Sequence, residues 1–488
     1  MNPVFVNKSC DPFDPPETPC RIGAYVQYAV NVTSSDHVIK TIQFVKQHNI
    51  RFVVKGTGHD YLGRSTGTGA VSVWMHNLRK VTPIPQFQSA HYTGPAFKVQ
   101  PGVSGFEVAN AAHDEGLVVV SGECPSVSFA GGFIQGGGHG VLSSYRGLAA
   151  DQTLEFEVIT TQGKLVPASP TQNQDLYWAL SGGGGGNYGI VWSVTVKAFQ
   201  DLPVTIASIN FTSDGISQDT YWKAIDAYQA STPALTDAKV WGEAEYNNTD
   251  FKLNPVFGVN KSSSEITALI QPLLDTLDNL GVNYVTATNT YSGYLEGYNT
   301  LTSMKGFKVA DTLAGSRFLP RSLWKDPATL KSVQSTIRSI VEGGTTAIDF
   351  IFRPTLEVAG NPNNAVLPAW RDIERHLAIE IPLVDGQSQQ EVSDIQNRIT
   401  TEIVPQLKKL APGSGSYHNE ADVHDPDWKQ AFWGANYDKL LAIKDNWDPD
   451  QLLYGSVNVG GDRWKETEEG RLCKVYLDTP RLVDQTLN

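Results

Sequence analysis

The chain has 488 residues, of which 40% are hydrophobic and 18% are charged. This balance is typical of folded globular proteins, and the length exceeds what one hydrophobic core usually serves, so we expect two or more domains. The formal net charge of −13, without a cluster of Lys and Arg, argues against nucleic acid or an anionic membrane as a partner.

The N-terminal segment favours an extracellular protein. It begins "MNPVFVNKSC", without the apolar stretch of a signal peptide, so we expect a signal to be absent or already removed. Cys10 and Cys20 enclose a proline-rich stretch and are predicted to form a disulfide, which is typical of an oxidising compartment. No apolar run is long enough to cross a bilayer, and the state of Cys473 is left open. N-glycosylation sequons stand at Asn7, Asn31, Asn210, Asn247 and Asn260.

The N-terminal part of the chain alternates helix and strand patterns. Apolar residues at helical spacing predict a helix within 34–49, and an apolar strand follows at 50–55. Ser104 and Glu107 form a capping box at the start of a second helix, before a buried strand that begins near residue 117. The alternation over 154–168 predicts a hairpin. We expect an α+β region with many glycine-rich turns.

Beyond residue 203 the pattern changes. Long amphipathic helices are predicted at 217–230 and 262–281, the second opened by a capping box of Ser262 and Glu265. Strand patterns lie between and after them, at 237–246, 347–357 and 375–384. Such an alternation predicts one antiparallel sheet covered on one face by helices, and the glycine-rich stretch 411–416 is expected to lead the chain back.

Several familiar motifs match only by accident. Residues 184–189 fit the dinucleotide-binding pattern, but a strand follows instead of the helix that such a site requires. Residues 63–67 fit a nucleophile elbow, but a glycine loop and a strand flank them. The run "HNEADVHD" offers His418, Glu420, His424 and Asp425 at a spacing that matches no zinc signature, so we predict no metal site.

Three glycine-rich segments remain, at 56–67, 122–140 and 180–191. Backbone N–H groups in such loops hold phosphates without a lysine, and a dinucleotide with a flat ring would need several of them. His59 stands in the first loop and Cys124 in the second, in a chain with 10 His and 4 Cys. Each also has a plain explanation, as a solvated turn histidine and a small buried thiol. Their coincidence in glycine loops favours reactive roles.

With "YRGLAADQTLEFEVITTQG" and the C-terminal "WGANYDKLLAIKDNWDPDQLL", these loops make nearly the whole chain similar to a known family. It resembles the berberine-bridge-enzyme-like branch of the vanillyl alcohol oxidase/p-cresol methylhydroxylase flavoproteins, in particular the secreted fungal members. The resemblance implies an α+β, two-domain flavoprotein. Residues 1–203 and 413–488 would form an FAD-binding domain of two α+β subdomains, and residues 204–412 a substrate domain with the helix-covered antiparallel sheet.

The resemblance also implies that FAD is bound by two covalent bonds. His59 would bind the 8α-methyl group and Cys124 would bind C6, on one edge of the ring, which should make the flavin a stronger oxidant. Val127 lies where the family controls access of oxygen to the flavin, and its small side chain favours an oxidase. The other implied FAD contacts are Gly56, Thr57, Gly58, Asp60, Gly63, Arg64, Ser65, Gly131, Gly132, Gly136, Gly137, Gly138, His139, Gly140, Gly186, Asn187, Tyr188, Ile190 and Asn419.

The expected catalytic base departs from the family pattern. Family members often carry Tyr-x-Asn-Tyr, whose second tyrosine is the base, whereas this chain reads Tyr417-His418-Asn419-Glu420. In a strand, His418 and Glu420 would share one face. Burial would raise the pKa of Glu420 so that it accepts a substrate proton, with Tyr417 as a catalytic partner. Alternatively, Glu420 binds a backbone N–H or an arginine, and the base lies on the substrate-domain sheet.

The implied function is that of a secreted, FAD-dependent oxidase. A substrate CH–OH group would pass a hydride to flavin N5, and O₂ would re-oxidise the flavin and form H₂O₂. The substrate is expected to be an oligosaccharide or a secondary metabolite. A flavin-loaded protein with little oxidase activity is the alternative. We expect a monomer whose partners are a small substrate and O₂, without nucleic acid or membrane.

Overall fold

The computed structural model describes residues 3–6, 9–10, 15–301, 312–384 and 386–475. Its N-terminal part contains a parallel sheet of order β1-β3-β2 and an antiparallel sheet of order β4-β5-β9-β7-β8. The strands of these sheets are β1 Tyr28–Asn31, β2 Phe52–Lys55, β3 Val71–Trp74, β4 Val81–Gln88, β5 Thr93–Val99, β7 Thr153–Ile159, β8 Leu165–Ala168 and β9 Ile190–Lys197. The helices of this part are α1 Ser35–Gln47, α2 Gly105–Asp114, α3 Ser143–Arg146 and α4 Gln174–Leu180.

The elements predicted for this part are largely confirmed. The capping box of α2 is present, since Ser104 Oγ accepts the Glu107 N–H (3.3 Å) and Glu107 Oε2 accepts the Ser104 N–H (2.9 Å). The hairpin forms from β7 and β8. The buried strand expected near residue 117 is shorter than its apolar run, because only β6 (Leu117–Val118) finds a partner, β10 (Phe199–Gln200).

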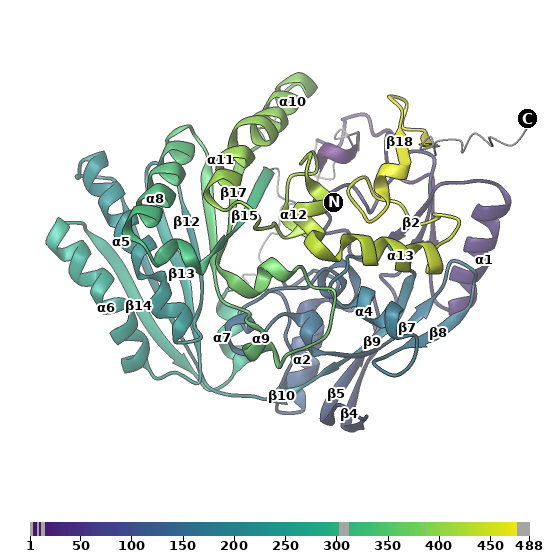
Figure 1. Ribbon diagram of the computed structural model, residues 1–488, viewed down its shortest axis with the longest axis horizontal. Coiled ribbons are helices and arrows are strands. Elements are labelled where there is room, and N and C mark those ends of the chain that lie inside the picture. The colour runs from purple at the N-terminus through teal and green to yellow at the C-terminus, as the bar shows by residue number, and fades with distance from the viewer. Residues whose placement is uncertain (1–2, 7–8, 11–14, 302–311, 385, 476–488) are drawn as a thin grey trace, which may run out of the picture.

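The second part is built on a seven-stranded sheet of order β14-β11-β13-β12-β16-β17-β15, in which all neighbours are antiparallel. Its strands are β11 Val204–Thr212, β12 Trp241–Tyr246, β13 Asp250–Val259, β14 Tyr284–Tyr291, β15 Thr312–Pro320, β16 Thr346–Ile351 and β17 Ile373–Pro382. The helices of this part are α5 Gln218–Asp237, α6 Ser263–Leu280, α7 Tyr294–Leu301, α8 Pro327–Glu342, α9 Leu356–Ala359, α10 Gln389–Arg398 and α11 Val404–Leu410. Figure 1 shows α5, α6 and α8 on the outer face of the sheet, which confirms the predicted layer of helices.

The two faces of this sheet have different environments. Side chains alternate between the faces of a strand, and the register places Glu243 of β12 opposite Phe350 of β16, which lies opposite His376 of β17. This row faces the N-terminal part, whereas the adjacent residues Ile351 and Leu377 pack into the core beneath the helices. One sheet therefore supplies both a hydrophobic core and a wall facing the rest of the molecule.

After α11 the chain returns to the N-terminal part. The turn η7 (His418–Glu420) is followed by α12 Trp428–Trp433, α13 Tyr437–Trp447, β18 Trp464–Glu466 and β19 Leu472–Lys474. Helix α13 packs on α4, and Leu453 pairs with Phe52 of β2. Figure 1 shows this C-terminal segment, in yellow-green, beside the purple and blue N-terminal elements. Segments far apart in the sequence are thus brought together.

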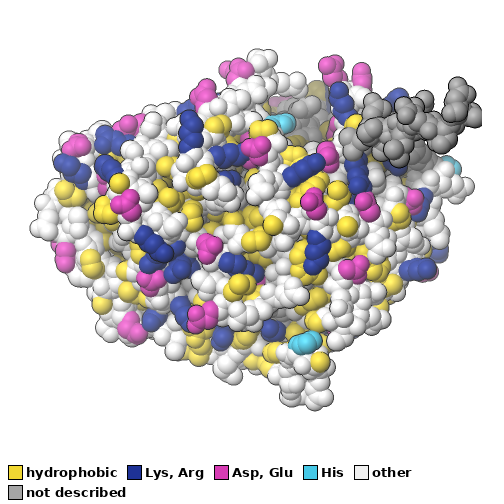
Figure 2. Space-filling view, in the orientation of Figure 1, with side chains coloured by type: hydrophobic (Ala, Val, Ile, Leu, Met, Phe, Trp, Pro, Cys, Tyr) yellow, Lys and Arg dark blue, Asp and Glu magenta, His cyan; other side chains and the backbone are white. Residues whose placement is uncertain are grey.

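The predicted disulfide between Cys10 and Cys20 is present, with the two Cα atoms 4.5 Å apart. The sequon residues Asn31 and Asn260 are exposed and Asn210 and Asn247 are half-buried, while Asn7 lies outside the described residues. In the described ranges, none of the helices combines the length and apolar character needed to cross a bilayer. Figure 2 shows acidic and basic side chains interspersed on the visible face.

Candidate functional site

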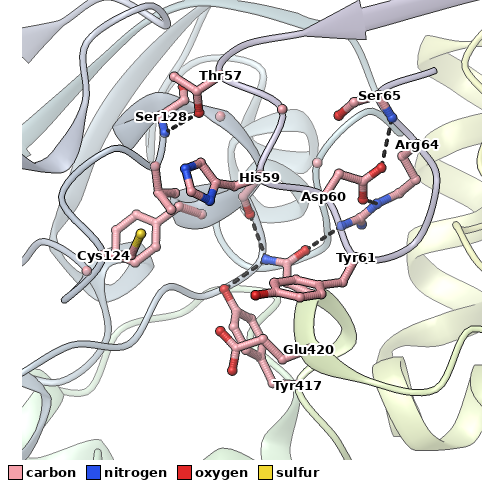
Figure 3. A pocket seen from close by; sticks show the side chains of 18 of the residues that line it. Thr57, His59, Asp60, Tyr61, Arg64, Ser65, Cys124, Ser128, Tyr417 and Glu420 are labelled. Atoms are coloured by element: carbon pink, nitrogen blue, oxygen red, sulfur yellow. Dashed lines mark hydrogen bonds and ion pairs between the residues drawn. The ribbon is translucent and has the colours of Figure 1, made fainter. Parts of the chain in front are cut away.

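A cavity of about 760 Å³ lies between the glycine-rich loops and the seven-stranded sheet. Its walls come from the first loop near His59, the second loop near Cys124, the third loop at Gly185 and Gly186, the inner face of the sheet, and the C-terminal turn. This volume is within the range of small-molecule and cofactor sites. Figure 3 shows the labelled side chains converging on it, with Tyr417 and Glu420 entering from the C-terminal turn.

The first loop is held in shape by Asp60. Its carboxylate accepts the N–H of Leu62 (3.1 Å), the Nε–H of Arg64 (3.2 Å) and the N–H of Ser65 (2.8 Å). Arg64 Nη2 also donates to Asn419 Oδ1 (2.7 Å), which connects this loop to the C-terminal turn (Figure 3). The carboxylate of Asp60 is thus engaged within its own loop, while the residue also lines the cavity, and its contact with the cofactor stays a prediction.

The two predicted anchor residues lie on the same side of the cavity (Figure 3). His59 Nε2 is 2.8 Å from Ser126 Oγ, and burial lowers the pKa of His59 to about 4, so the imidazole is neutral at pH 7. Cys124 Sγ is 3.9 Å from the same hydroxyl, and burial raises the pKa of the thiol. Thr57 Oγ1 accepts the Ser128 N–H (3.0 Å), which connects the two loops directly.

The cavity wall fits a polar, flat cofactor such as FAD. Arg64 Nη1, Gln135 Oε1 and Asn458 Oδ1 are buried atoms of wall residues, and none has a hydrogen-bond partner in the described part of the chain. Such atoms need a partner, which a bound dinucleotide would offer. The wall also contains glycines where a Cβ would be too close to Ser128, 3.0 Å at Gly56 and 2.9 Å at Gly131. Gln135 and Asn458 were not singled out from the sequence.

Most residues predicted to surround the cofactor line this cavity. Those that do are Gly56, Thr57, Gly58, His59, Asp60, Arg64, Ser65, Cys124, Val127, Gly131, Gly132, His139, Gly186 and Asn419. The predicted residues that do not line it are Gly63, Gly136, Gly137, Gly138, Gly140, Asn187, Tyr188 and Ile190. Asn187, for example, is fully buried, donates to the Gly184 carbonyl (3.1 Å) and accepts the Val459 N–H (3.2 Å). Asn187 therefore holds the third loop in place without lining the cavity.

The C-terminal turn differs from the predicted strand. Residues His418–Glu420 form a 3₁₀ turn, in which residues two apart do not share a face. Tyr417, Asn419 and Glu420 line the cavity, whereas His418 packs against Trp433 with ring centroids 4.6 Å apart. The expectation that His418 and Glu420 point the same way is therefore wrong.

Glu420 is held by two histidines from distant segments. His139 Nε2 lies 3.2 Å from both carboxylate oxygens, and His376 Nε2 lies 2.9 Å from Oε2. Burial by itself raises the pKa of Glu420, but the two imidazoles outweigh it and hold the pKa well below its usual range. The predicted rise is wrong, and so is the alternative that Glu420 binds a backbone N–H or an arginine. The substrate-domain sheet does contribute to this cluster, because His376 lies on β17. The sequence signal for it was the alternation His376-Ala378-Glu380, which places these three side chains on one face of the strand.

The nitrogen and oxygen atoms of His139, His376 and Glu420 that could bind a metal lie within 4.8 Å of one another. A metal ion would accept this spacing, so the absence of a metal site stays a prediction. Nδ1 of both histidines is buried without a described partner, whereas metal-bound histidines usually donate this second N–H. A hydrogen-bonded acid–base cluster therefore explains the arrangement better. The four residues of the "HNEADVHD" run do not converge, since Asp425 pairs with Lys408 (2.6 Å).

The sheet wall carries further carboxyl groups that were not identified from the sequence. Glu243 of β12 and Glu380 of β17 line the cavity, and burial, together with nearby Glu420, raises the pKa of each to about 7. Trp241 and Phe350 give the same wall an apolar surface. Among the described residues, Arg64 is the single Lys or Arg of the cavity wall. The sheet side of the described wall is therefore acidic and apolar, without a lysine or arginine.

Comparison with known proteins gives the family. Residues 26–169 match a family model described as an FAD binding domain, and residues 416–459 match one described as berberine and berberine-like. The FAD-linked oxidoreductase patO of Aspergillus clavatus is 41% identical over 98% of this chain and 83% of the relative. The VAO-type flavoprotein oxidase VAO615 of Thermothelomyces thermophilus is 36% identical over 96% of this chain and 82% of the relative.

Solved structures agree with this assignment. The VAO-type flavoprotein MtVAO615 of Myceliophthora thermophila C1 matches with a TM-score of 0.90 and 35% identity, over 96% of this chain and 86% of that chain. A glucooligosaccharide oxidase of Acremonium strictum, described with 6-S-cysteinyl, 8α-N1-histidyl FAD, matches with a TM-score of 0.71 and 18% identity, over 89% and 92% of the two chains, which supports the fold alone. As the resemblance predicted, the chain belongs to the berberine-bridge-enzyme-like FAD-linked oxidoreductases of the vanillyl alcohol oxidase superfamily.

Proposed function

We propose that this oxidoreductase is an oxidase that binds FAD covalently through His59 and Cys124 and oxidises a CH–OH group of a small, neutral substrate. One observation carries the proposal. The loops with both anchor residues line the same cavity as Glu420 and His139, and His376 supports Glu420 from behind that wall. When bound, FAD accepts a hydride at N5 and passes the electron pair to O₂, forming H₂O₂.

The proposed base is the cluster of Glu420, His139 and His376. The Glu420 side chain is 32% exposed, toward the cavity, and its low pKa keeps it ionised and ready to accept a hydrogen bond from a substrate hydroxyl. A carboxylate with a low pKa is a weak base by itself. Although burial opposes protonation of His139, Glu420 raises its pKa, so the pair can hold the substrate proton together.

Tyr417 is proposed to orient the substrate oxygen. Its hydroxyl accepts a hydrogen bond from Asn419 Nδ2 (2.8 Å), which leaves the tyrosine proton for donation. Burial, with nearby Glu420, raises the pKa of Tyr417, so it remains protonated at neutral pH. This role differs from that of the second tyrosine in the family pattern, because Glu420 stands in that place.

The sheet wall favours a neutral alcohol of the secondary-metabolite type over an oligosaccharide. Trp241 and Phe350 offer apolar surface, while Glu243 and Glu380 would repel an anionic substrate. The relatives that match along the chain include a bifunctional decalin synthase of Penicillium decumbens, 37% identical over 97% of this chain. The carbohydrate oxidases among the structural neighbours are below 20% identical and inform the fold alone.

Val127, which lines the cavity, is proposed to leave room for O₂ through its small side chain. Secretion is supported by the Cys10–Cys20 disulfide and by the exposed sequon residues Asn31 and Asn260. We further propose that the protein acts as a monomer.

The test begins with the purified protein. Denaturation in acid should pellet the yellow colour with the chain, and peptide mass mapping should place flavin on both His59 and Cys124. Oxygen-dependent H₂O₂ formation should follow addition of alicyclic or aromatic alcohols. A colourless protein would overturn the proposal. Turnover of cello- or xylo-oligosaccharides, without turnover of the other alcohols, would show that the substrate is an oligosaccharide instead. Reduced flavin that persists for minutes in air would favour the alternative of a flavin-loaded protein with little oxidase activity.

Glu420→Gln tests the base. Its kcat should fall by about 10²–10⁴-fold, because the variant cannot take the substrate proton. Glu243→Gln makes the same chemical change in the same cavity, without contact to the histidines, and its kcat should stay within roughly tenfold of the parent. Covalent flavin should be retained in both variants. Equal losses in the two would argue against Glu420 as part of the base.

A further inference from the structure

A single hydroxyl contacts both residues that are proposed to bind FAD. Ser126 lies two residues after Cys124 in the second glycine-rich loop, and its Oγ is 2.8 Å from His59 Nε2 and 3.9 Å from Cys124 Sγ. The proposed function uses both anchors but leaves Ser126 without a role. The Ser126 hydroxyl thus connects the two side chains that are proposed to react with the flavin, and its role there needs an explanation.

The backbone around Ser126 is fastened on both sides. The Phe106 N–H donates to the Pro125 carbonyl (3.0 Å), and the Gly105 N–H donates to the Val127 carbonyl (2.9 Å), both from the first turn of α2. The capping box of α2 fixes that turn in its own right. The Ser126 hydroxyl is therefore presented from a rigid support, which is how positioning groups are held within a few tenths of an ångström.

The chemistry of a hydroxyl suits both contacts, because it can accept one hydrogen bond and donate another. A neutral imidazole carries one N–H and one lone pair, so if His59 Nε2–H donates to Ser126 Oγ, the lone pair is on Nδ1. The hydroxyl proton can then be donated to Cys124 Sγ, which stabilises the thiolate, the reactive form of cysteine. This contact opposes the burial that raises the pKa of Cys124.

We propose that Ser126 is a positioning residue for covalent attachment of FAD, which directs Nδ1 of His59 to the 8α carbon and the sulfur of Cys124 to C6. The inference rests on the proposed double attachment and extends it. At each anchor, a bond forms between the flavin carbon and nitrogen or sulfur, and the C–H bond breaks. The electron pair of that C–H bond passes to O₂. One proton from the carbon and one from the imidazole or thiol complete H₂O₂.

The experiment compares Ser126→Ala with Ser126→Thr, which keeps the hydroxyl. Intact mass counts the attachments, since each bond removes two hydrogen atoms, and peptide mapping assigns them to His59 or Cys124. In pulse-labelled cells, Ser126→Ala should acquire covalent flavin roughly 10- to 100-fold more slowly, because a misplaced nucleophile loses rate by that order. Ser126→Thr should restore most of the rate. Melting temperatures of both variants separate this effect from a general loss of structure.

A second measurement needs no variant. Spectroscopy on the purified flavin peptide identifies which imidazole nitrogen carries the flavin, and the inference requires Nδ1. Attachment through Nε2, or equal attachment rates in the parent and Ser126→Ala, would overturn the role of Ser126 while leaving the double attachment intact. A parent protein without covalent flavin would overturn both the proposed function and this inference. The two failures are therefore distinguishable.

Discussion

The two faces of the seven-stranded sheet treat buried carboxyl groups in opposite ways. On the helix-covered face, Asp349 pairs with Arg375 (2.6 Å) and accepts hydrogen bonds from the hydroxyls of Tyr228 (3.2 Å) and Tyr246 (3.0 Å). On the cavity face, Glu243 and Glu380 have no ion pair among the described residues, and burial raises the pKa of each to about 7. The helix-covered face therefore gives its buried carboxylate a counter-charge, whereas the cavity face does not.

This contrast arises between adjacent residues. Asp349 precedes Phe350 on β16, and Arg375 precedes His376 on β17. Each strand thus carries an ion-pair residue toward the helices, and the next residue either lines the cavity, as Phe350 does, or contacts Glu420 of the cavity wall, as His376 does. Because side chains alternate along a strand, one step in sequence exchanges one environment for the other. On the helix-covered face, Asp349 and Arg375 neutralise each other within the protein. On the cavity face, the charge of the carboxyl groups depends on the pH and on the ligand that binds beside them.

The largest effect is expected when the ion pair is broken. Asp349→Asn should lower the free energy of unfolding by about 3–5 kcal/mol, because it leaves the buried guanidinium of Arg375 without its counter-charge. Urea denaturation measures the change. Glu243→Gln, the equivalent change on the cavity face, is the matched control and should cause no loss. A loss below about 1 kcal/mol in Asp349→Asn would show that the two faces are not distinct in this way.

A smaller effect of opposite sign is expected on the cavity face. The pKa values of Glu243 and Glu380 are raised from 4.5 to about 7, so the stability that their protonation contributes is present below pH 4.5 and is lost as the pH rises through 7. Glu243→Gln with Glu380→Gln should therefore increase the free energy of unfolding at pH 8 by roughly 1–3 kcal/mol and flatten its decline between pH 4.5 and 7.

Glu402→Gln serves as the control for this pH dependence, because Glu402 is not part of the cavity wall and its side chain is 66% exposed. It should leave the slope between pH 4.5 and 7 unchanged. Glu420 contributes a slope of opposite sign, since its lowered pKa gives stability that is lost as the pH falls below its usual range. A parent protein whose stability rises from pH 5 to 8, with no response to the Gln substitutions, would contradict the assignment.

The smallest effect concerns ligand binding. A carboxylate-bearing analogue of an accepted alcohol should bind more weakly than the neutral alcohol as the pH rises through 7, by roughly tenfold, because Glu243 and Glu380 become charged. Titration of the flavin absorbance at pH 6 and pH 8 gives both dissociation constants. In the double Gln variant the ratio of the two constants should become independent of pH, and a ratio that still changes would point to His139, whose pKa Glu420 raises although burial opposes it.

Local features of this protein could be predicted from the sequence alone. The capping boxes at Ser104 and Ser262 formed because their partners are three residues away, and the hairpin of β7 and β8 formed because its two runs are joined by a short turn. The glycine-rich loops that carry His59 and Cys124 could also be identified, because a high glycine content is visible within a short stretch of sequence.

Only the tertiary structure decided the environment of Glu420. His139 is 281 residues away and His376 is 44 residues away, and no local pattern indicates that both would reach the same carboxylate. Their hydrogen bonds reverse the pKa shift that burial alone would cause. The alternation in β17 indicates that His376 and Glu380 share a face, but not what that face contacts. A pKa depends on every group that folding brings within a few ångströms, and those groups come from three separate parts of the chain.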